Sequence, residues 1–199
     1  MNVVFDIGNV LVRWSPAEIM RRALPPHEDA QAHAQRFFGH PLWRELNRGR
    51  FSEREAQAHY VRELGLPSEI VASVFHHVKD SQDLIGGTAA LLPRLQAAGY
   101  PMYALTDNVH EIVAYLRSRY DFWQYFRGVV VSAELDLLKP QPEIFRHLLD
   151  THTLQAAQTV FIDDMPANVA AAREQGMHAF QFNDAAQCER DLAALGLVF

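Results

Sequence analysis

Five short apolar runs, rich in β-branched or aromatic side chains, recur along the chain. Apolar runs of this length, bounded by polar or turn-forming residues, predict strands that are buried in a sheet. These predicted strands cover residues 2–6, 101–106, 128–131, 158–163 and 178–182.

Amphipathic segments with a helical period separate the predicted strands. Two of them begin with a proline in the first turn and two end on a glycine, which are the residues that favour these positions. The predicted helices cover residues 88–99, 111–120, 142–150 and 166–176. Strands that alternate with single helices imply right-handed crossovers, so we expect an α/β fold with a Rossmann-like parallel sheet flanked by helices.

Residues 15–85 break this alternation, because they contain helical patterns and no convincing strand. Prolines and glycines at 25–26, 39–41 and 65–67 separate the predicted helices, which cover residues 16–24, 29–39, 52–64 and 69–80. We therefore interpret residues 15–85 as a small α-helical cap inserted after the first strand. Residues 1–14 and 86–199 would then form the α/β core.

Composition narrows the class of protein. Hydrophobic residues make up 49% and charged residues 21% of the 199 positions, which is ordinary for a globular protein. The net charge of −6 argues against a nucleic-acid partner. No stretch approaches the roughly 18 apolar residues of a membrane span, and the single cysteine, Cys188, excludes an internal disulfide. We expect a soluble cytoplasmic protein, monomeric or weakly dimeric, without a membrane partner.

Charged and polar residues stand where the predicted strands end. The first strand ends at Asp6, the second at Thr106, Asp107 and Asn108, and the fourth at Asp163 and Asp164; Lys139 lies in the loop after the third. Each alone has an ordinary structural explanation, such as a turn or a helix cap. Since ligands bind outside the carboxyl ends of parallel strands, the joint placement predicts a functional site.

The chemistry of these side chains favours a phosphoryl group as ligand. Carboxylate oxygens with few histidines nearby suit Mg²⁺, which usually binds together with water and a substrate phosphate. A lysine and a threonine hydroxyl add donors to phosphoryl oxygens. One aspartate then remains free to attack phosphorus, which is established covalent chemistry.

The chain resembles the haloacid dehalogenase-like (HAD) superfamily of phosphohydrolases over nearly its whole length, and four motifs of that superfamily occur in the same order. The nucleophile motif DxDx(T/V) matches "DIGNV" at Asp6, and the Lys-Pro-x-Pro motif matches "KPQP" at Lys139. A threonine closing the second strand and an acidic pair closing the fourth complete the pattern. The resemblance implies metal ligands at Asp6, the Gly8 carbonyl and the pair Asp163 and Asp164, with Asp164 as the direct ligand.

"FDIGNVLV" and "WRELNRGRFSERE" resemble a branch that is related to bacterial α-D-glucose-1-phosphate phosphatases. Three positions stand out. Gly8, like its counterpart in that branch, removes the usual general acid/base; Asp107 stands where the branch commonly has Asn; and Asp136 replaces a frequent Gly. Small residues beside Asp6 would let backbone approach metal and phosphate closely.

The resemblance implies a Mg²⁺-dependent phosphatase acting on a small phosphorylated metabolite, with a sugar phosphate as one candidate. Asp6, Thr106 and Lys139 would carry the catalysis through an aspartyl-phosphate. Thr106, Asp107, Asn108 and Lys139 would bind the substrate. A 2-haloacid dehalogenase and a catalytically impaired phosphometabolite-binding protein are the alternatives.

The glycine at position 8 has its own consequence for the leaving group. Without a carboxylate at position 8, the proton for the leaving group would come from water or a cap residue, or the substrate would have a leaving group that needs little help. We therefore expect a preference for anomeric or aryl phosphates. Trp14 and Trp43 could line a substrate pocket, although core packing is the favoured interpretation for both, and the histidines show no metal-binding spacing.

Overall fold

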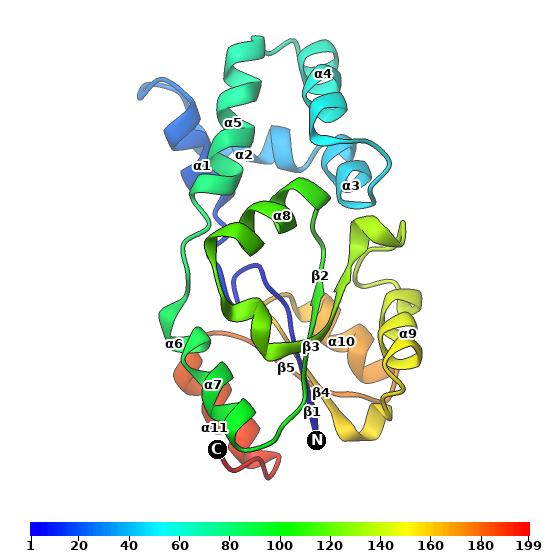
Figure 1. Ribbon diagram of the computed structural model, residues 1–199. Helices are drawn as coiled ribbons and strands as arrows, with labels where there is room; N and C mark the ends of the chain where they lie inside the picture. Colours follow the sequence, from blue (N-terminus) through cyan, green and yellow to red (C-terminus); the bar gives the residue numbers. More distant parts are fainter.

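A parallel sheet of five strands forms the centre of the molecule, in the order β3-β2-β1-β4-β5 (Figure 1). The computed structural model describes all 199 residues. The strands are β1 (Asn2–Phe5), β2 (Met102–Thr106), β3 (Phe126–Val131), β4 (Thr159–Asp163) and β5 (His178–Gln181). The first strand is therefore central, with β2 and β4 as its neighbours.

Helices cover both faces of this sheet, so its strands are apolar on both sides. The helices of the core are α6 (Gly86–Ala89), α7 (Leu91–Ala97), α8 (His110–Arg119), α9 (Pro142–Thr151), α10 (Pro166–Glu174) and α11 (Ala185–Ala194). Val3 and Phe5 pack with α7, α8 and α11 on one face, and Val4 packs with α9 and α10 on the other. Three short 3₁₀ helices are η1 (Phe122–Tyr125), η2 (Ser132–Glu134) and η3 (Ala156–Gln158).

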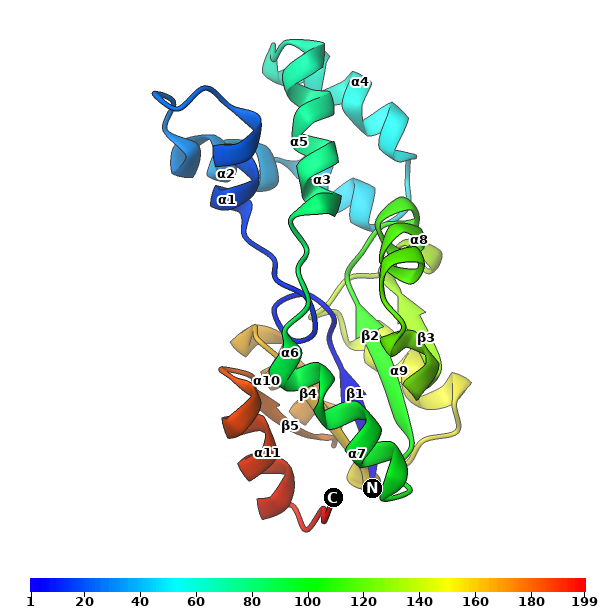
Figure 2. The same ribbon diagram turned by 60° about the vertical axis from the view of Figure 1, so that its left-hand side comes forward.

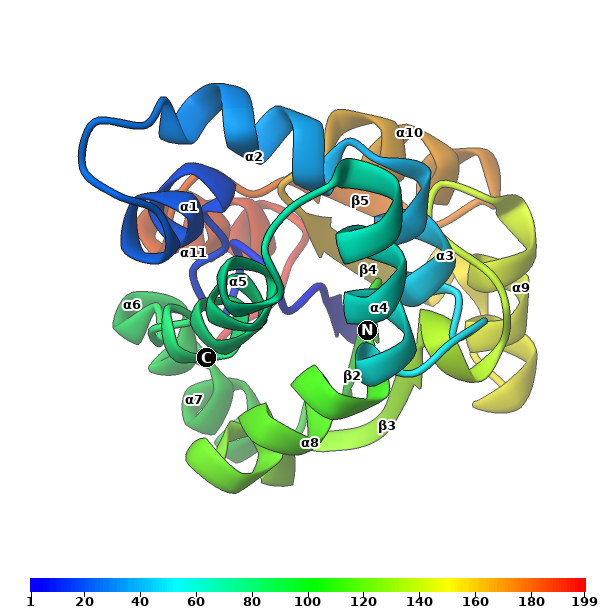
Figure 3. The ribbon, with the colours of Figure 1, turned by 90° about the horizontal axis from the view of Figure 1, so that it is seen from above.

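Five further helices form a layer, called the cap here, beyond the carboxyl ends of the strands (Figures 1 and 3). They are α1 (Pro16–Ala23), α2 (Ala30–Phe38), α3 (Pro41–Asn47), α4 (Glu53–Leu64) and α5 (Ser68–Asp80). An aromatic cluster holds them together, in which Phe37 stacks on Tyr60 at 3.8 Å between ring centroids. The Tyr60 hydroxyl donates to the Phe37 carbonyl at 3.0 Å, which satisfies both buried groups.

The two connections between cap and core run side by side (Figure 2). The Arg13 amide donates to the Asp83 carbonyl at 2.8 Å, and the Ile85 amide donates to the Leu11 carbonyl at 2.7 Å. The chain therefore leaves the sheet after β1 and returns before α6 through one hydrogen-bonded ribbon.

The predicted α/β architecture is confirmed, with all five strands present and parallel. Two helices were missed. Residues 39–41 were interpreted only as a break, but His40 caps α3 and Pro41 occupies its first turn, where a proline costs no hydrogen bond. The other, α11, follows the fifth strand and begins at the cap Asp184. No helix combines the length and apolarity needed to cross a membrane.

Candidate active site

The candidate site lies at the carboxyl end of the central strand β1, beside its neighbours β2 and β4, where the order of the strands along the chain reverses. Phe5 is level with Ala104 on β2 and with Ile162 on β4, so Asp6 emerges beside the ends of both strands. The Asp6 amide continues the ladder by donating to the Ile162 carbonyl at 2.9 Å. Sheet register therefore fixes the position of this carboxylate, and the strand order puts it at a topological switch point.

Lys139 is buried at the centre of the site. Its Nζ lies 2.9 Å from Asp6 Oδ1 and 2.7 Å from Asp163 Oδ2, and it donates to the Leu105 carbonyl at 3.1 Å. Burial alone would lower the pKa of Lys139, but the charges of Asp6 and Asp163 raise it above its usual value. Lys139 is therefore a permanent cation that joins the ends of three strands.

Burial dominates the electrostatics of Asp6. It raises the pKa of this carboxyl to about 8, against the opposing charge of Lys139. The Oδ1 atom accepts from the Ile7 amide at 2.7 Å and faces Lys139, whereas Oδ2 has no hydrogen-bond partner in the protein. One oxygen is thus held in place and the other is available to a ligand.

The two carboxylates of the acidic pair have different surroundings. Asp163 is fully buried, and both of its oxygens are engaged by Lys139, Asn168 and the Met165 amide. Asp164 is half-buried, and only its Oδ2 is bound, by Asn9 Nδ2 at 2.9 Å. Asp164, which lines the cavity, therefore keeps one oxygen free.

The donor set fits a divalent cation. Oxygens of Asp6, Asp163 and Asp164 all lie within 4.8 Å of one another. Asp6, Asp164 and the Gly8 carbonyl each offer an oxygen without a hydrogen bond in the protein. Burial raises the pKa of Asp164, as it does for Asp6. Lys139 alone does not neutralise these carboxylates, and hard oxygen donors with excess negative charge suit Mg²⁺.

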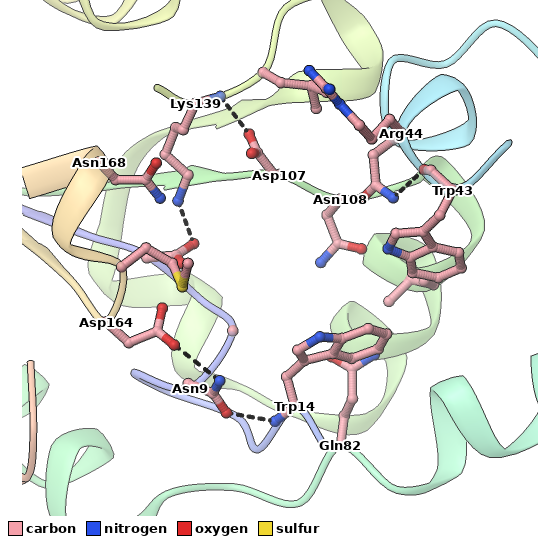
Figure 4. Close-up of a pocket in the computed structure, with 16 residues that line it drawn as sticks. Asn9, Trp14, Trp43, Arg44, Gln82, Asp107, Asn108, Lys139, Asp164 and Asn168 are labelled. Carbon is pink, nitrogen blue, oxygen red and sulfur yellow. Dashed lines mark hydrogen bonds and ion pairs between the residues drawn. The ribbon is translucent and has the colours of Figure 1, made fainter. Parts of the chain in front are cut away.

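A cavity of about 350 Å³ opens between these carboxylates and the cap (Figure 4). Its wall on the cap side is aromatic: Trp14 and Trp43 stack with ring centroids 5.5 Å apart and planes at 14°. Phe38 packs edge-on against both rings. The Trp14 amide donates to Asn9 Oδ1 at 2.9 Å, so Asn9 connects this wall to Asp164.

A serine joins the cap to the core at the edge of the cavity. Ser132 Oγ accepts from the Asn108 amide at 2.9 Å and donates to the Asn47 carbonyl at 2.6 Å. Nearby, a Cβ added to Gly49 would lie 2.1 Å from the Ala133 carbonyl oxygen, and Gly49 has φ +76°. A glycine is therefore required where the loop after α3 meets the core.

Asp136 forms a second link between cap and core. Its carboxylate pairs with Arg48 at 3.3 Å and with Arg50 at 3.2 Å, and these arginines hold its pKa below its usual value, Arg50 most strongly. Its φ of +54° lies in the left-handed region that favours glycine, which gives a physical reason for the Gly frequent there in relatives. Here an aspartate tolerates that conformation and gains two ion pairs.

Most of the predicted site residues meet in one place. The cavity lining includes Asp6, Gly8, Asp107, Asn108, Lys139 and Asp164. Thr106 and Asp163 do not line it, since they are 1% and 0% exposed and lie behind the lining residues. Asp107 does not cap α8; its Oδ1 accepts from the Lys139 amide at 3.0 Å.

Other features of the cavity differ from expectation. Trp14 and Trp43 were interpreted mainly as core residues, but both line the cavity. Sequence reasoning missed the lining residues Asn9, Arg44, Asn47, Gln82, Met165 and Asn168. At Gly8, an added Cβ would meet only Trp14 Cβ, at an ordinary 3.9 Å, so packing within the protein does not demand a glycine there.

Comparison with solved structures identifies the fold. A HAD family enzyme from Bacteroides thetaiotaomicron, solved in complex with magnesium and inorganic phosphate, superposes with a TM-score of 0.77, although only 19% of residues are identical. The match covers 92% of this chain and 94% of that one. The chain therefore shares the α/β fold of that enzyme.

Sequence comparison then shows the family. The profile described as haloacid dehalogenase-like hydrolase matches residues 3–182, and the chain belongs to this family of hydrolases. The sesquiterpene phosphatase astK of Aspergillus oryzae is 26% identical over 181 residues, which span 91% of this chain and 89% of the relative. The drimenol cyclase drtB of Aspergillus calidoustus is 25% identical over 96% of this chain, but the match spans only 35% of that longer protein.

Proposed function

We propose that this hydrolase is a Mg²⁺-dependent phosphatase that cleaves a small phosphomonoester through an aspartyl-phosphate. The observation that carries the proposal is the Asp6 carboxylate, which is held by Lys139 and the Ile7 amide through one oxygen while the other is free beside the cavity. The similarity to a sesquiterpene phosphatase supports phosphate ester hydrolysis as the reaction class.

The residues for the metal follow from the free oxygens. Asp6, the Gly8 carbonyl and Asp164 would hold Mg²⁺ directly, while Asp163 would support the site by orienting Lys139 and Asn168. When bound, the ion supplies positive charge next to the phosphoryl oxygens. This division explains why both oxygens of Asp163 are already bound and one of Asp164 is not.

The remaining residues act on the phosphoryl group itself. The Asp6 carboxylate attacks phosphorus in line, and Lys139 neutralises charge that develops on the phosphoryl oxygens. Asn108, which lines the cavity just beyond the end of β2, orients the group, and Thr106 supports it from behind the lining. Water then hydrolyses the aspartyl-phosphate, and the cap limits access of bulk water during the first step.

The cavity suits a small organic leaving group. Its volume of about 350 Å³ lies at the low end of the range for small-molecule sites. The Trp14–Trp43 wall offers a flat apolar surface, and Asn47, Gln82 and Asn108 add amide groups that can bind hydroxyls. A sugar phosphate, as in the branch that the sequence resembles, combines a ring face with hydroxyls and is our first candidate.

The test is phosphate release from a panel of phosphorylated metabolites with Mg²⁺, with EDTA and with Mg²⁺ restored. We expect activity that EDTA abolishes and Mg²⁺ recovers, and that Asp6→Asn reduces by orders of magnitude in a folded protein. An Asp150→Asn variant, altered at an exposed position on α9, is the matched control. Release of halide from 2-haloacids without any metal would support the dehalogenase alternative; metabolite binding without turnover would support a binding protein.

A further inference from the structure

We propose that Asp107 is the general acid and base of this site, in place of the carboxylate that Gly8 removes. The proposal rests on the proposed phosphatase function and names a residue that this function needs. It assigns a catalytic role to a position where the related branch commonly carries an uncharged asparagine.

The placement of Asp107 makes it available to the leaving group. It follows the last residue of β2, next to the Asn108 and Lys139 positions of the cavity lining. Its Oδ1 is fixed by the Lys139 amide at 3.0 Å, and its Oδ2 has no hydrogen-bond partner in the protein. In Figure 4 Asp107 lies between Lys139 and Arg44, on the same cavity that Asp6 and the aromatic wall border.

The cavity lining offers no other free proton donor of suitable pKa. No histidine, cysteine, tyrosine or glutamate lines it, and its acids are Asp6, Asp107 and Asp164. Asp6 is needed as nucleophile, and Asp164 faces Asn9 and the metal position. Arginine guanidinium groups do not give up protons in proteins, and Lys139 is committed to Asp6 and Asp163. Asp107 is the acid that remains.

The surroundings of Asp107 favour the protonated form that an acid must have. Burial raises its pKa, and the charge of Asp163 acts in the same direction, while Lys139 and Arg48 oppose them. A bound phosphoryl group adds further negative charge nearby. Both effects raise the pKa of the Asp107 carboxyl, which favours its exchange of a proton with the reacting groups.

Asp107 gives a proton in the first step and regains one in the second. In the first, an Asp6 oxygen forms a bond to phosphorus, the bond from phosphorus to the leaving oxygen breaks, and that oxygen receives the proton of Asp107. In the second, Asp107 takes a proton from water as the water oxygen bonds to phosphorus. The bond to Asp6 breaks, its electron pair returns to the carboxylate, and Asp107 is again protonated.

The experiment compares leaving groups of graded acidity, from p-nitrophenyl phosphate to primary alkyl phosphates, in the wild type and in Asp107→Asn. Asparagine keeps the shape and the acceptor for the Lys139 amide. We expect a shallow dependence of kcat/KM, which reports the step that expels the leaving group, on leaving-group pKa in the wild type, in place of the preference for anomeric or aryl phosphates that Gly8 alone predicts. In Asp107→Asn, alkyl phosphates should lose about 10²- to 10⁴-fold, and p-nitrophenyl phosphate less than about tenfold.

A second variant provides rescue, because there is room for a side chain at Gly8. Adding Gly8→Asp to Asp107→Asn should restore alkyl phosphate turnover and flatten the dependence again. An equal change for all leaving groups in Asp107→Asn, or a steep dependence already in the wild type, would overturn the proposal for Asp107 alone. Absence of hydrolysis of every phosphate by the wild type would instead overturn the proposed function.

Discussion

Replacing Lys139 by methionine would remove the only buried cation of the site without leaving a large cavity. Lys139 Nζ contacts two carboxylates, at 2.9 Å for Asp6 and 2.7 Å for Asp163, and is almost fully buried. Loss of one partner from a buried ion pair leaves an uncompensated charge and typically costs about 3–5 kcal/mol. We expect a fall of that size in the free energy of unfolding, measured by urea denaturation in EDTA at pH 8.

The loss should depend on pH in a defined direction. The pKa of Asp6 is raised in the folded protein, to about 8, so its contribution to stability is present below the ordinary value and is lost as pH rises through about 8. Lys139→Met removes the charge that opposes this rise in pKa. Below about pH 8 Asp6 is protonated in both folded proteins, so the variant should fall further behind the wild type only as pH rises above about 8, by up to about 1.4 kcal/mol per pH unit.

Lys79→Met is the matched control, since Lys79 also pairs with a carboxylate, Glu53 at 2.9 Å, but in a more exposed setting. Such pairs contribute about 0–1 kcal/mol. If Lys139→Met lost less than about 1 kcal/mol at every pH, as the control should, the view of Lys139 as the buried counter-charge of the site would be refuted.

The remaining predictions concern the junction of cap and core. Gly49→Ala should lower stability and kcat/KM together, because its Cβ would clash with the Ala133 carbonyl; Gly65→Ala, with a similar φ of +66° and open space, should cost only about 1–2 kcal/mol and leave kcat/KM unchanged. Asp136→Asn should lower the unfolding free energy by less than about 1 kcal/mol, and 1 M salt should remove this effect. In the same urea titration, Asp136→Ala should be less stable than Asp136→Gly, because residue 136 has a positive φ. Salt-insensitive loss in Asp136→Asn, or equal losses at both glycines, would contradict these explanations.

The polar residues at the strand ends were predictable from the sequence, because the local pattern of apolar residues shows where each strand ends. Once the apolar runs were recognised as parallel strands, Asp6, Asp107 and Asp164 had to emerge at one edge. Thr106 and Asp163 emerge there as well, but one residue of register separates a side chain that lines a cavity from one that lies behind it. A sequence pattern does not resolve that difference without the packing of the neighbouring helices.

The cap side of the site was much less predictable. Arg44, Asn47 and Trp43 belong to α3, a helix hidden by the residues that also signal a break, His40 and Pro41. Gln82 reaches the cavity from the segment that returns to the core. Trp14 lines the cavity because α3 places Trp43 against it, a contact between distant segments that no local periodicity encodes.

The paired connections between cap and core bear on how such a protein can change over evolutionary time. Leu11 and Ile85 are joined by a hydrogen bond of 2.7 Å, so the 73 residues between them (85 − 11 − 1) start and finish at one point of the core. Insertions whose ends are already held together add little closure entropy to the domain that carries them. Helices can then be lengthened, shortened or exchanged as a cassette while the register of β1, and with it the position of Asp6, stays the same. Selection can thus alter which molecules are admitted without rebuilding the chemistry beneath.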